Sequence, residues 1–256
     1  MNEVVLEVEG LTKAFGGLRA ISELSFSTVR GEILGVIGPN GSGKTTLFNL
    51  ITGVFPATSG SVSFRGKPVS GLQTDAIARL GLVRTFQSAT VFKQESVYEN
   101  IRRGSMFGSI GNPAWFFKKG LVAESARKAK ATAEEVLEFS GLADVAGTSA
   151  GNLPYGKQKM LGVAIALAQH PLQLLMDEPA AGLNPSETEA MGELIAQIRS
   201  ARGIDVILVE HDMRMVTSVC DRILALNYGK VIAIDVPEQI VAHPEVIEAY
   251  LGVDHE

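Results

Sequence analysis

The residues from Gly38 to Thr46 have the types and spacing of a phosphate-binding loop. They are Gly-Pro-Asn-Gly-Ser-Gly-Lys-Thr-Thr and fit the pattern G-x-x-x-x-G-K-[ST]. Glycines let backbone N–H groups surround phosphate, while Lys44 can reach the β- and γ-phosphates and the Thr45 hydroxyl can bind Mg²⁺. A glycine-rich turn with a chance Lys-Thr pair is the simpler alternative. The predicted phosphate-binding residues are Gly38, Asn40, Gly41, Ser42, Gly43, Lys44, Thr45 and Thr46.

Two carboxylates follow an apolar stretch later in the chain. Leu174–Met176 predicts a buried strand, and Asp177 and Glu178 come directly after it. In a parallel sheet, ligands bind beyond the carboxyl ends of the strands. Asp177 is therefore expected beside the phosphate loop, where it can hold the Mg²⁺ shell, and Glu178 can polarise an attacking water. The alternative is a solvent-exposed helix cap.

Two more polar residues stand at the ends of predicted strands. Gln87 ends the short strand Leu82–Gln87 and is a candidate for contact with Mg²⁺ or water. His211 follows Val206–Glu210 and is expected where a γ-phosphate would lie. A strand-end glutamine or a lone histidine is often structural, so that role stays open for both residues.

Strands and helices must bring these residues to one edge of a sheet. Glu32–Ile37 predicts a buried strand before the phosphate loop, and Thr45–Ile51 predicts a helix after it. From Leu172 onward strands and helices alternate, which implies a mostly parallel sheet with helices on both faces. The later predicted elements are strands Leu172–Met176 and Asp205–Val209, helices Ser186–Ser200 and Asp212–Cys220, and a hairpin of Arg222–Leu226 with Val231–Ile234.

The N-terminal and middle regions differ from this pattern. Short strands indicate an antiparallel β subdomain at the N-terminus, and the spacing of Ser96 and Glu99 is that of a helix capping box. We predict an α/β fold in which residues 1–89 and 170–256 form a P-loop NTPase core and residues 90–169 form a helical insertion. The remaining predicted elements are strands Val4–Val8, Ile21–Ser27 and Ser61–Phe64, a turn over Leu11–Gly17, and helices Leu121–Ser140 and Asn152–Leu167.

Composition excludes some classes of function. The chain has 256 residues and a net charge of −5, whereas proteins that bind duplex DNA are usually basic, so no nucleic-acid partner is expected. Its one cysteine, Cys220, cannot form an internal disulfide, which suits a reducing compartment. No apolar run approaches the roughly 18 residues of a membrane span.

A phosphate loop, a strand-end glutamine, a strand-end acidic pair and a strand-end histidine together resemble the nucleotide-binding subunit of an ABC transporter. The resemblance covers essentially the whole chain. It implies that Phe15 stacks on the adenine of ATP, that Gln87 couples the core to the helical domain and membrane partner, and that His211 is the switch histidine. It also implies two such subunits paired head to tail, as a homodimer or with a paralogue.

In that family each ATP lies between the phosphate loop of one subunit and the L-S-G-G-Q signature of the other. Leu153–Gln158 stands at the signature position here. The resemblance therefore implies that Pro154, Tyr155 and Gly156 contact the nucleotide bound to the opposite subunit. Ala181–Pro185 stands at the D-loop position. The chain departs from the family pattern at Pro154 (usually Ser), Tyr155 (usually Gly), Lys157 (usually Gln) and Asn184 (usually Asp).

Three other segments look like those of the ATP-binding subunits of branched-chain amino acid importers. They are Phe15–Leu18, Asp177–Pro185 and Val246–Gly252. This resemblance implies an ATPase, with Mg²⁺, at the cytoplasmic face of a membrane, bound to integral permease subunits and working with an extracytoplasmic substrate-binding protein. Another cargo (urea, amides or an exported lipid), an ABC ATPase without a membrane partner, and a P-loop kinase are the alternatives.

Aromatic residues gather in the insertion. Trp115, Phe116 and Phe117 are adjacent and are followed by Lys118 and Lys119. Exposed apolar clusters often mark a partner site, so this segment is predicted to contact the membrane subunits. The alternative is that the three rings pack within a small core of the insertion.

Overall fold

The structure is a computed structural model that describes residues 3–85, 91–106 and 119–251. The chain forms two compact units. The first unit comprises Met1–Arg84, Leu172–Ala181 and Thr188–Glu256, and the second comprises Thr85–Pro171 and Gly182–Glu187. Gln87 and the aromatic cluster Trp115–Phe117 lie outside the described residues, so the predictions made for them stay predictions.

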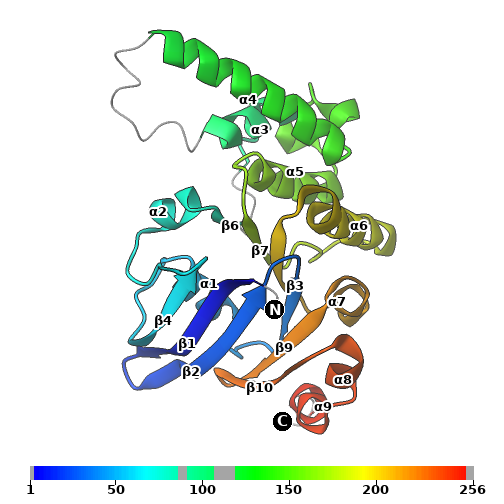
Figure 1. Ribbon diagram of the computed structural model, residues 1–256. Helices are drawn as coiled ribbons and strands as arrows, with labels where there is room; N and C mark the ends of the chain where they lie inside the picture. Colours follow the sequence, from blue (N-terminus) through cyan, green and yellow to red (C-terminus); the bar gives the residue numbers. More distant parts are fainter. Residues whose placement is uncertain (1–2, 86–90, 107–118, 252–256) are drawn as a thin grey trace. The chain divides into compact units, whose positions relative to one another are not determined.

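A six-stranded sheet carries the phosphate loop in the first unit (Figure 1). Its strand order is β10-β9-β3-β8-β7-β6, and all neighbours are parallel except β10, which pairs antiparallel with β9. Every residue of β3, β7 and β8 is buried, as expected for central strands covered on both faces. The strands are β3 (Ile33–Ile37), β6 (Leu82–Arg84), β7 (Gln173–Asp177), β8 (Asp205–Val209), β9 (Arg222–Asn227) and β10 (Lys230–Asp235).

The first unit also contains a four-stranded antiparallel sheet of order β2-β1-β4-β5. Its strands are β1 (Val4–Phe15), β2 (Leu18–Val29), β4 (Ser59–Phe64) and β5 (Lys67–Pro68). The predicted turn over Leu11–Gly17 is wrong, because Leu11–Phe15 continues β1. Gly10, with φ of 54°, lies at a register shift between Val8 and Leu11. That irregularity breaks the alternation by which a single long strand is recognised.

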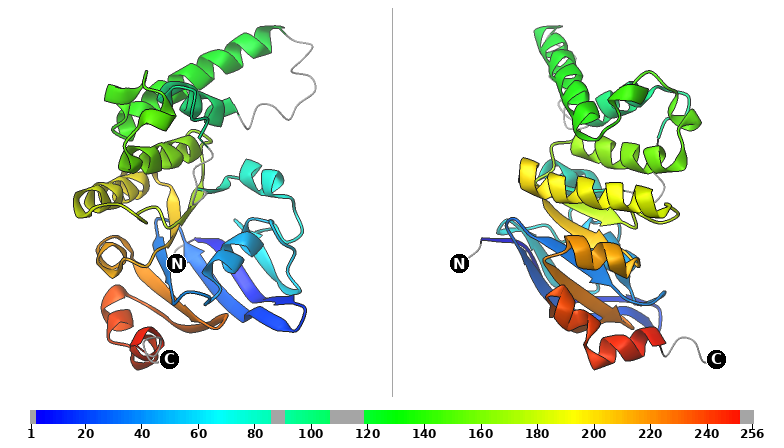
Figure 2. Two further views of the ribbon diagram at one scale, coloured as in Figure 1. Left: turned by 180° about the vertical axis from the view of Figure 1, so that it is seen from behind. Right: turned by 90° about the vertical axis from the view of Figure 1, so that its right-hand side faces the viewer.

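One hydrophobic core joins the two sheets. Helix α1 (Lys44–Ile51) buries Leu47, Phe48 and Ile51 in a cluster that includes residues of β1, β2, β4 and one face of β3. On the other face of β3, a Cβ at Gly35 would meet Cys220 and Val216, so helix α7 (Met213–Val219) packs closely there. The remaining helices of this unit are α2 (Thr74–Arg79), α8 (Pro237–Val241), α9 (Pro244–Leu251) and most of α6 (Pro185–Arg202). Helices α8 and α9 lie against the β9–β10 hairpin (Figure 2).

The second unit is helical. It contains α3 (Val97–Met106), α4 (Lys119–Phe139) and α5 (Tyr155–Leu167), with short 3₁₀ turns at Ala143–Val145 and Ala150–Asn152. The Ser96 hydroxyl accepts a hydrogen bond from the Glu99 N–H at 3.1 Å, as the capping spacing predicts. The predicted start of a helix at Asn152 is wrong, because Leu153 is extended before Pro154 and α5 begins at Tyr155. None of the helices described is both long and apolar enough to cross a membrane.

Candidate active site

The phosphate loop joins the end of β3 to the start of α1. Gly38 has φ of 153°, and a Cβ on it would collide with the Leu226 carbonyl oxygen. Gly43 has φ of 110°, and a Cβ there would lie 2.8 Å from the Ala20 carbonyl oxygen. Only glycine fits at these two positions, so the loop conformation follows directly from the sequence pattern.

Lys44 lies inside the loop. Its Nζ donates hydrogen bonds to the carbonyl oxygens of Gly38 at 2.6 Å and Pro39 at 3.0 Å. Burial lowers the pKa of the Lys44 ammonium, and the carboxylates of Glu178 and Asp177 partly offset that shift because they favour the charged form. The ammonium therefore stands where it can exchange carbonyl partners for phosphate oxygens.

The N-terminus of α1 suits an anion. The helix has no acidic residue in its first turn, and its first backbone N–H groups point out of the helix end. The Ser42 hydroxyl is buried and has no hydrogen-bond partner among the described residues. A phosphate oxygen at the helix end would satisfy such a group, so the loop fits the phosphates of a nucleotide.

The two predicted carboxylates end β7 in different backbone conformations. Asp177 is the last residue of β7 and is 4% exposed. Glu178 has φ of 48°, a left-handed value that is uncommon outside glycine, and its N–H donates to the Val209 carbonyl oxygen at 2.9 Å. Backbone strain of this kind gathers at functional sites. The Glu178 side chain is half-buried, whereas that of Asp177 is buried.

His211 follows β8 and is supported by a carboxylate that the sequence analysis did not single out. Glu210 is fully buried, and it accepts hydrogen bonds from the backbone N–H groups of Ala180 at 2.7 Å and His211 at 3.1 Å. Burial raises the pKa of Glu210. His211 itself is exposed, with Nδ1 3.7 Å from Glu210 Oε2. A carboxylate directly after an apolar strand, the signal that marks Asp177, could have identified Glu210.

Phe15 lies on the surface at the tip of the β1–β2 hairpin. It is 46% exposed and therefore is not a core residue. Its ring packs edge to face on Phe55, with centroids 5.7 Å apart, and Lys13 Nζ lies 5.0 Å from the Phe15 centroid. An exposed ring held in this way can stack on a base.

The groups that could hold Mg²⁺ are oxygen donors. Thr45 is exposed in the first turn of α1, which follows β3, and Asp177 ends β7, which is separated from β3 by β8. The described residues contain no cluster of three His, Cys, Asp or Glu side chains suited to a metal. Mg²⁺ is typically held by one or two carboxylates together with substrate phosphates and water, so the site fits Mg²⁺ that arrives with a nucleotide.

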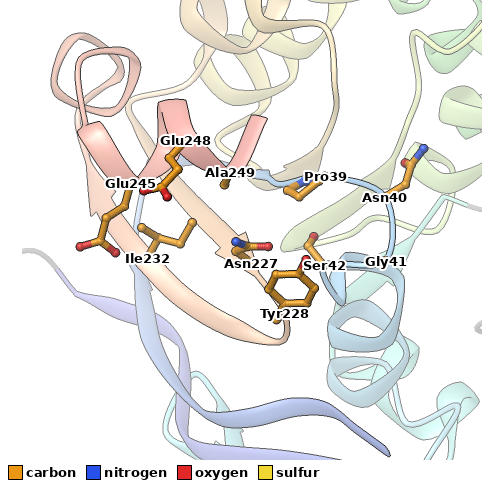
Figure 3. Close-up of a pocket in the computed structure, with 10 residues that line it drawn as sticks. All are labelled: Pro39, Asn40, Gly41, Ser42, Asn227, Tyr228, Ile232, Glu245, Glu248 and Ala249. Carbon is orange, nitrogen blue, oxygen red and sulfur yellow. The ribbon is translucent and has the colours of Figure 1, made fainter. Parts of the chain in front are cut away.

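A pocket of about 480 Å³ lies beside the phosphate loop (Figure 3). The loop residues Pro39–Ser42 form one wall, the β9–β10 turn forms another, and Glu245 and Glu248 of α9 complete it. These two carboxylates would repel a polyphosphate. We therefore place the triphosphate at the N-terminus of α1 and not in this pocket.

The signature segment and residues 182–185 of the D-loop segment belong to the second unit, while Ala181 belongs to the first. Pro154 is the exposed N-cap of α5, and Gly156 is buried against the side chain of Glu187. Lys157 pairs with Asp144 at 2.6 Å. Asn184 caps α6, because its side-chain oxygen accepts from the Glu187 N–H at 3.0 Å while Glu187 accepts from the Asn184 N–H at 3.0 Å. This reciprocal capping box gives Asn184 a structural role.

Comparisons with known proteins agree with this geometry. A family model described as ABC transporter matches residues 21–181, and one described as branched-chain amino acid ATP-binding cassette transporter matches residues 230–256. The chain is 42% identical over 253 residues to the high-affinity branched-chain amino acid transport ATP-binding protein BraF of Pseudomonas aeruginosa, covering 98% of this chain and 99% of BraF. It is 40% identical over 260 residues to the corresponding protein LivG of Escherichia coli, with coverage of 98% and 99%.

A solved structure supports the same assignment. The nucleotide-free ATP-binding cassette of an ABC transporter matches with a TM-score of 0.85 and 30% identity, covering 96% of this chain and 98% of that one. One family model thus spans more than half of the chain, and the sequence relatives are similar over nearly their full length. The chain belongs to the ABC transporter family, as one of its ATP-binding subunits.

Proposed function

We propose that this chain hydrolyses ATP to energise the import of branched-chain or related amino acids through membrane permease partners. The ATPase role rests on the phosphate loop, which contains the buried Lys44. The carboxylates of Asp177 and Glu178, at the end of β7, favour the charged form of this lysine. The cargo class rests on similarity over nearly the full chain to relatives named for branched-chain amino acid transport.

The chemistry is in-line attack of water on the γ-phosphate, for which catalysis is mostly positioning and charge stabilisation. The loop N–H groups and Lys44 hold the phosphates, and Glu178 accepts hydrogen bonding from the attacking water. Glu210 accepts a hydrogen bond from the backbone N–H of His211 and so helps to hold this residue in place. The His211 side chain contacts the γ-phosphate. Mg²⁺, when bound, supplies positive charge to the phosphate oxygens. Thr45, Asp177 and Gln87 are the residues that would hold it.

The working assembly is larger than this chain. Two ATP-binding subunits pair head to tail, so that Pro154, Tyr155 and Gly156 of one meet the nucleotide held by the other. Integral permease subunits hold the pair at the cytoplasmic face of the membrane, and an extracytoplasmic binding protein delivers the cargo. No nucleic acid takes part.

The test is transport by the reconstituted complex. Candidate permease subunits and a substrate-binding protein from the same organism would be assembled with this chain in proteoliposomes and supplied with ATP and radiolabelled leucine. Leucine uptake that requires ATP and vanishes with Glu178→Gln supports the proposal. Uptake of urea or a short amide but not leucine would show that the cargo is not a branched-chain amino acid. ATP hydrolysis without association with the permease subunits would refute the transport role.

A further inference from the structure

We propose that Arg84 is a positioning residue that fixes Asp177 relative to Thr45, and so sets the Mg²⁺ requirement of the nucleotide site. The inference rests on the proposed metal-binding role of Asp177. Arg84 has no part in the phosphate-loop pattern or in the strand-end pattern that identified the other site residues.

The guanidinium of Arg84 connects two elements of the site. Its Nη2 donates to Asp177 Oδ2 at 2.6 Å, and its Nη1 donates to Asn49 Oδ1 at 2.6 Å. Arg84 ends β6, which runs parallel to β7, and the register places it opposite Leu175. One planar group thus bridges the end of β7 and the side of α1.

The bridge reaches the face of α1 that carries the expected metal ligand. Asn49 lies four residues after Thr45 in α1, and residues at that spacing share one face of a helix. Fixing Asp177 to Asn49 therefore fixes its carboxylate relative to the Thr45 hydroxyl. Arg84 contacts Oδ2 of Asp177, and we assign contact with the metal shell to the other carboxylate oxygen, Oδ1.

The surroundings hold this bridge in one geometry. The side chains of Arg84 and Asp177 are only 9% and 4% exposed, and the Phe48 ring centroid lies 5.5 Å from the guanidinium carbon. A buried ion pair is costly to desolvate and is weak evidence for stability by itself. Its two-point contact is suited instead to orientation, since a planar guanidinium fixes both distance and angle.

A merely structural ion pair would behave differently from a positioning one. Loss of a structural pair lowers stability and weakens nucleotide binding with or without metal. Loss of a positioning pair raises the Mg²⁺ concentration that nucleotide binding needs, while metal-free binding is unchanged. Mutation of groups that orient metal ligands typically costs about 10–100-fold in metal affinity.

The experiment compares Arg84→Met and Arg84→Lys with wild type, using a non-hydrolysable ATP analogue. Affinity is measured in EDTA and across a Mg²⁺ titration, together with the melting temperature. We expect Arg84→Met to raise the half-saturating Mg²⁺ about tenfold with EDTA affinity within about twofold, and Arg84→Lys to recover part of the loss. Arg222→Met is the matched control, because it breaks the Arg222–Glu32 pair at the opposite end of the parallel strands.

The outcomes separate the inference from the function on which it rests. Asp177→Asn should raise the Mg²⁺ requirement, and if it does not, the metal role of Asp177 fails. The positioning role of Arg84 is overturned if Asp177→Asn raises the half-saturating Mg²⁺ concentration but Arg84→Met does not. It is also overturned if Arg84→Met lowers that concentration. If Arg84→Met weakens nucleotide binding equally in EDTA and in Mg²⁺, Arg84 has a structural role only. If Arg84→Met does not fold, Asn49→Ala serves instead, because it frees one end of the guanidinium. This variant is expected to raise the Mg²⁺ requirement about threefold, and an unchanged requirement would overturn the inference.

Discussion

Replacing Pro154 by serine should tighten the ATP-dependent dimer. Pro154 is the N-cap of α5, with φ of −54° and ψ of 150°, and it makes no side-chain cap hydrogen bond. Serine accepts this extended backbone and is among the preferred N-cap residues. Its hydroxyl can accept a hydrogen bond from the first turn of α5 and, in the proposed head-to-tail dimer, still donate to the γ-phosphate held by the opposite subunit. Proline can do neither.

The expected gain in the free energy of dimerisation follows from the number of new hydrogen bonds. A hydrogen bond contributes about 1 kcal/mol, or somewhat more with a charged acceptor. A symmetric dimer contains two such contacts, so about 2 kcal/mol corresponds to roughly 30-fold tighter dimerisation. In the monomer, a serine cap adds about 1 kcal/mol, while loss of the rigid proline removes about 0.4–1 kcal/mol. The melting temperature of the monomer should therefore change little.

The assay is analytical ultracentrifugation against ATP concentration, in the Glu178→Gln background so that ATP is not consumed. Pro154→Ala is the control, because it removes proline without adding a hydroxyl, and it should dimerise like the parent. Equal dimerisation of the serine and alanine variants, or weaker dimerisation with serine, would show that proline suits its site and that the missing hydroxyl is not a deficit.

Two further substitutions test nucleotide binding. Lys44→Ala should abolish the Mg-ATP thermal shift, which for wild type at about 100 times Kd corresponds to about 2.7 kcal/mol of stabilisation; an undiminished shift would contradict the placement of the triphosphate. Phe15→Ala should weaken ATP binding by about 1–3 kcal/mol, with little discrimination among bases, because stacking tolerates any base. Since Phe15 is 46% exposed, its removal should leave the melting temperature without ligand nearly unchanged, and a large fall would indicate a packing role.

The central strands and the phosphate loop were predictable because local sequence determines them. β8 occupies the predicted Asp205–Val209, and α1 begins within one residue of the predicted start. The loop needs glycine at Gly38 and Gly43 for reasons that the pattern itself encodes. Continuous apolar runs likewise identify strands that are buried on both faces.

Features that depend on tertiary packing were not predicted. Helices α2, α8 and α9 have only six, five and eight residues, and helices this short are stabilised mainly by the surfaces on which they pack. The Arg84–Asp177 pair joins residues 93 positions apart. It exists because β6 lies beside β7, and strand order is not encoded in residue spacing.

The most direct test of the proposed ATPase is phosphate release by the Glu178→Gln variant. Glu178 follows the Asp177 carboxylate with a strained backbone, and glutamine keeps its size while removing the proposed general base. The variant should bind ATP with near wild-type affinity, accumulate an ATP-bound dimer, and release phosphate at least about 100-fold more slowly. Hydrolysis at a near wild-type rate by the purified variant would show that Glu178 does not activate the attacking water and would contradict the account.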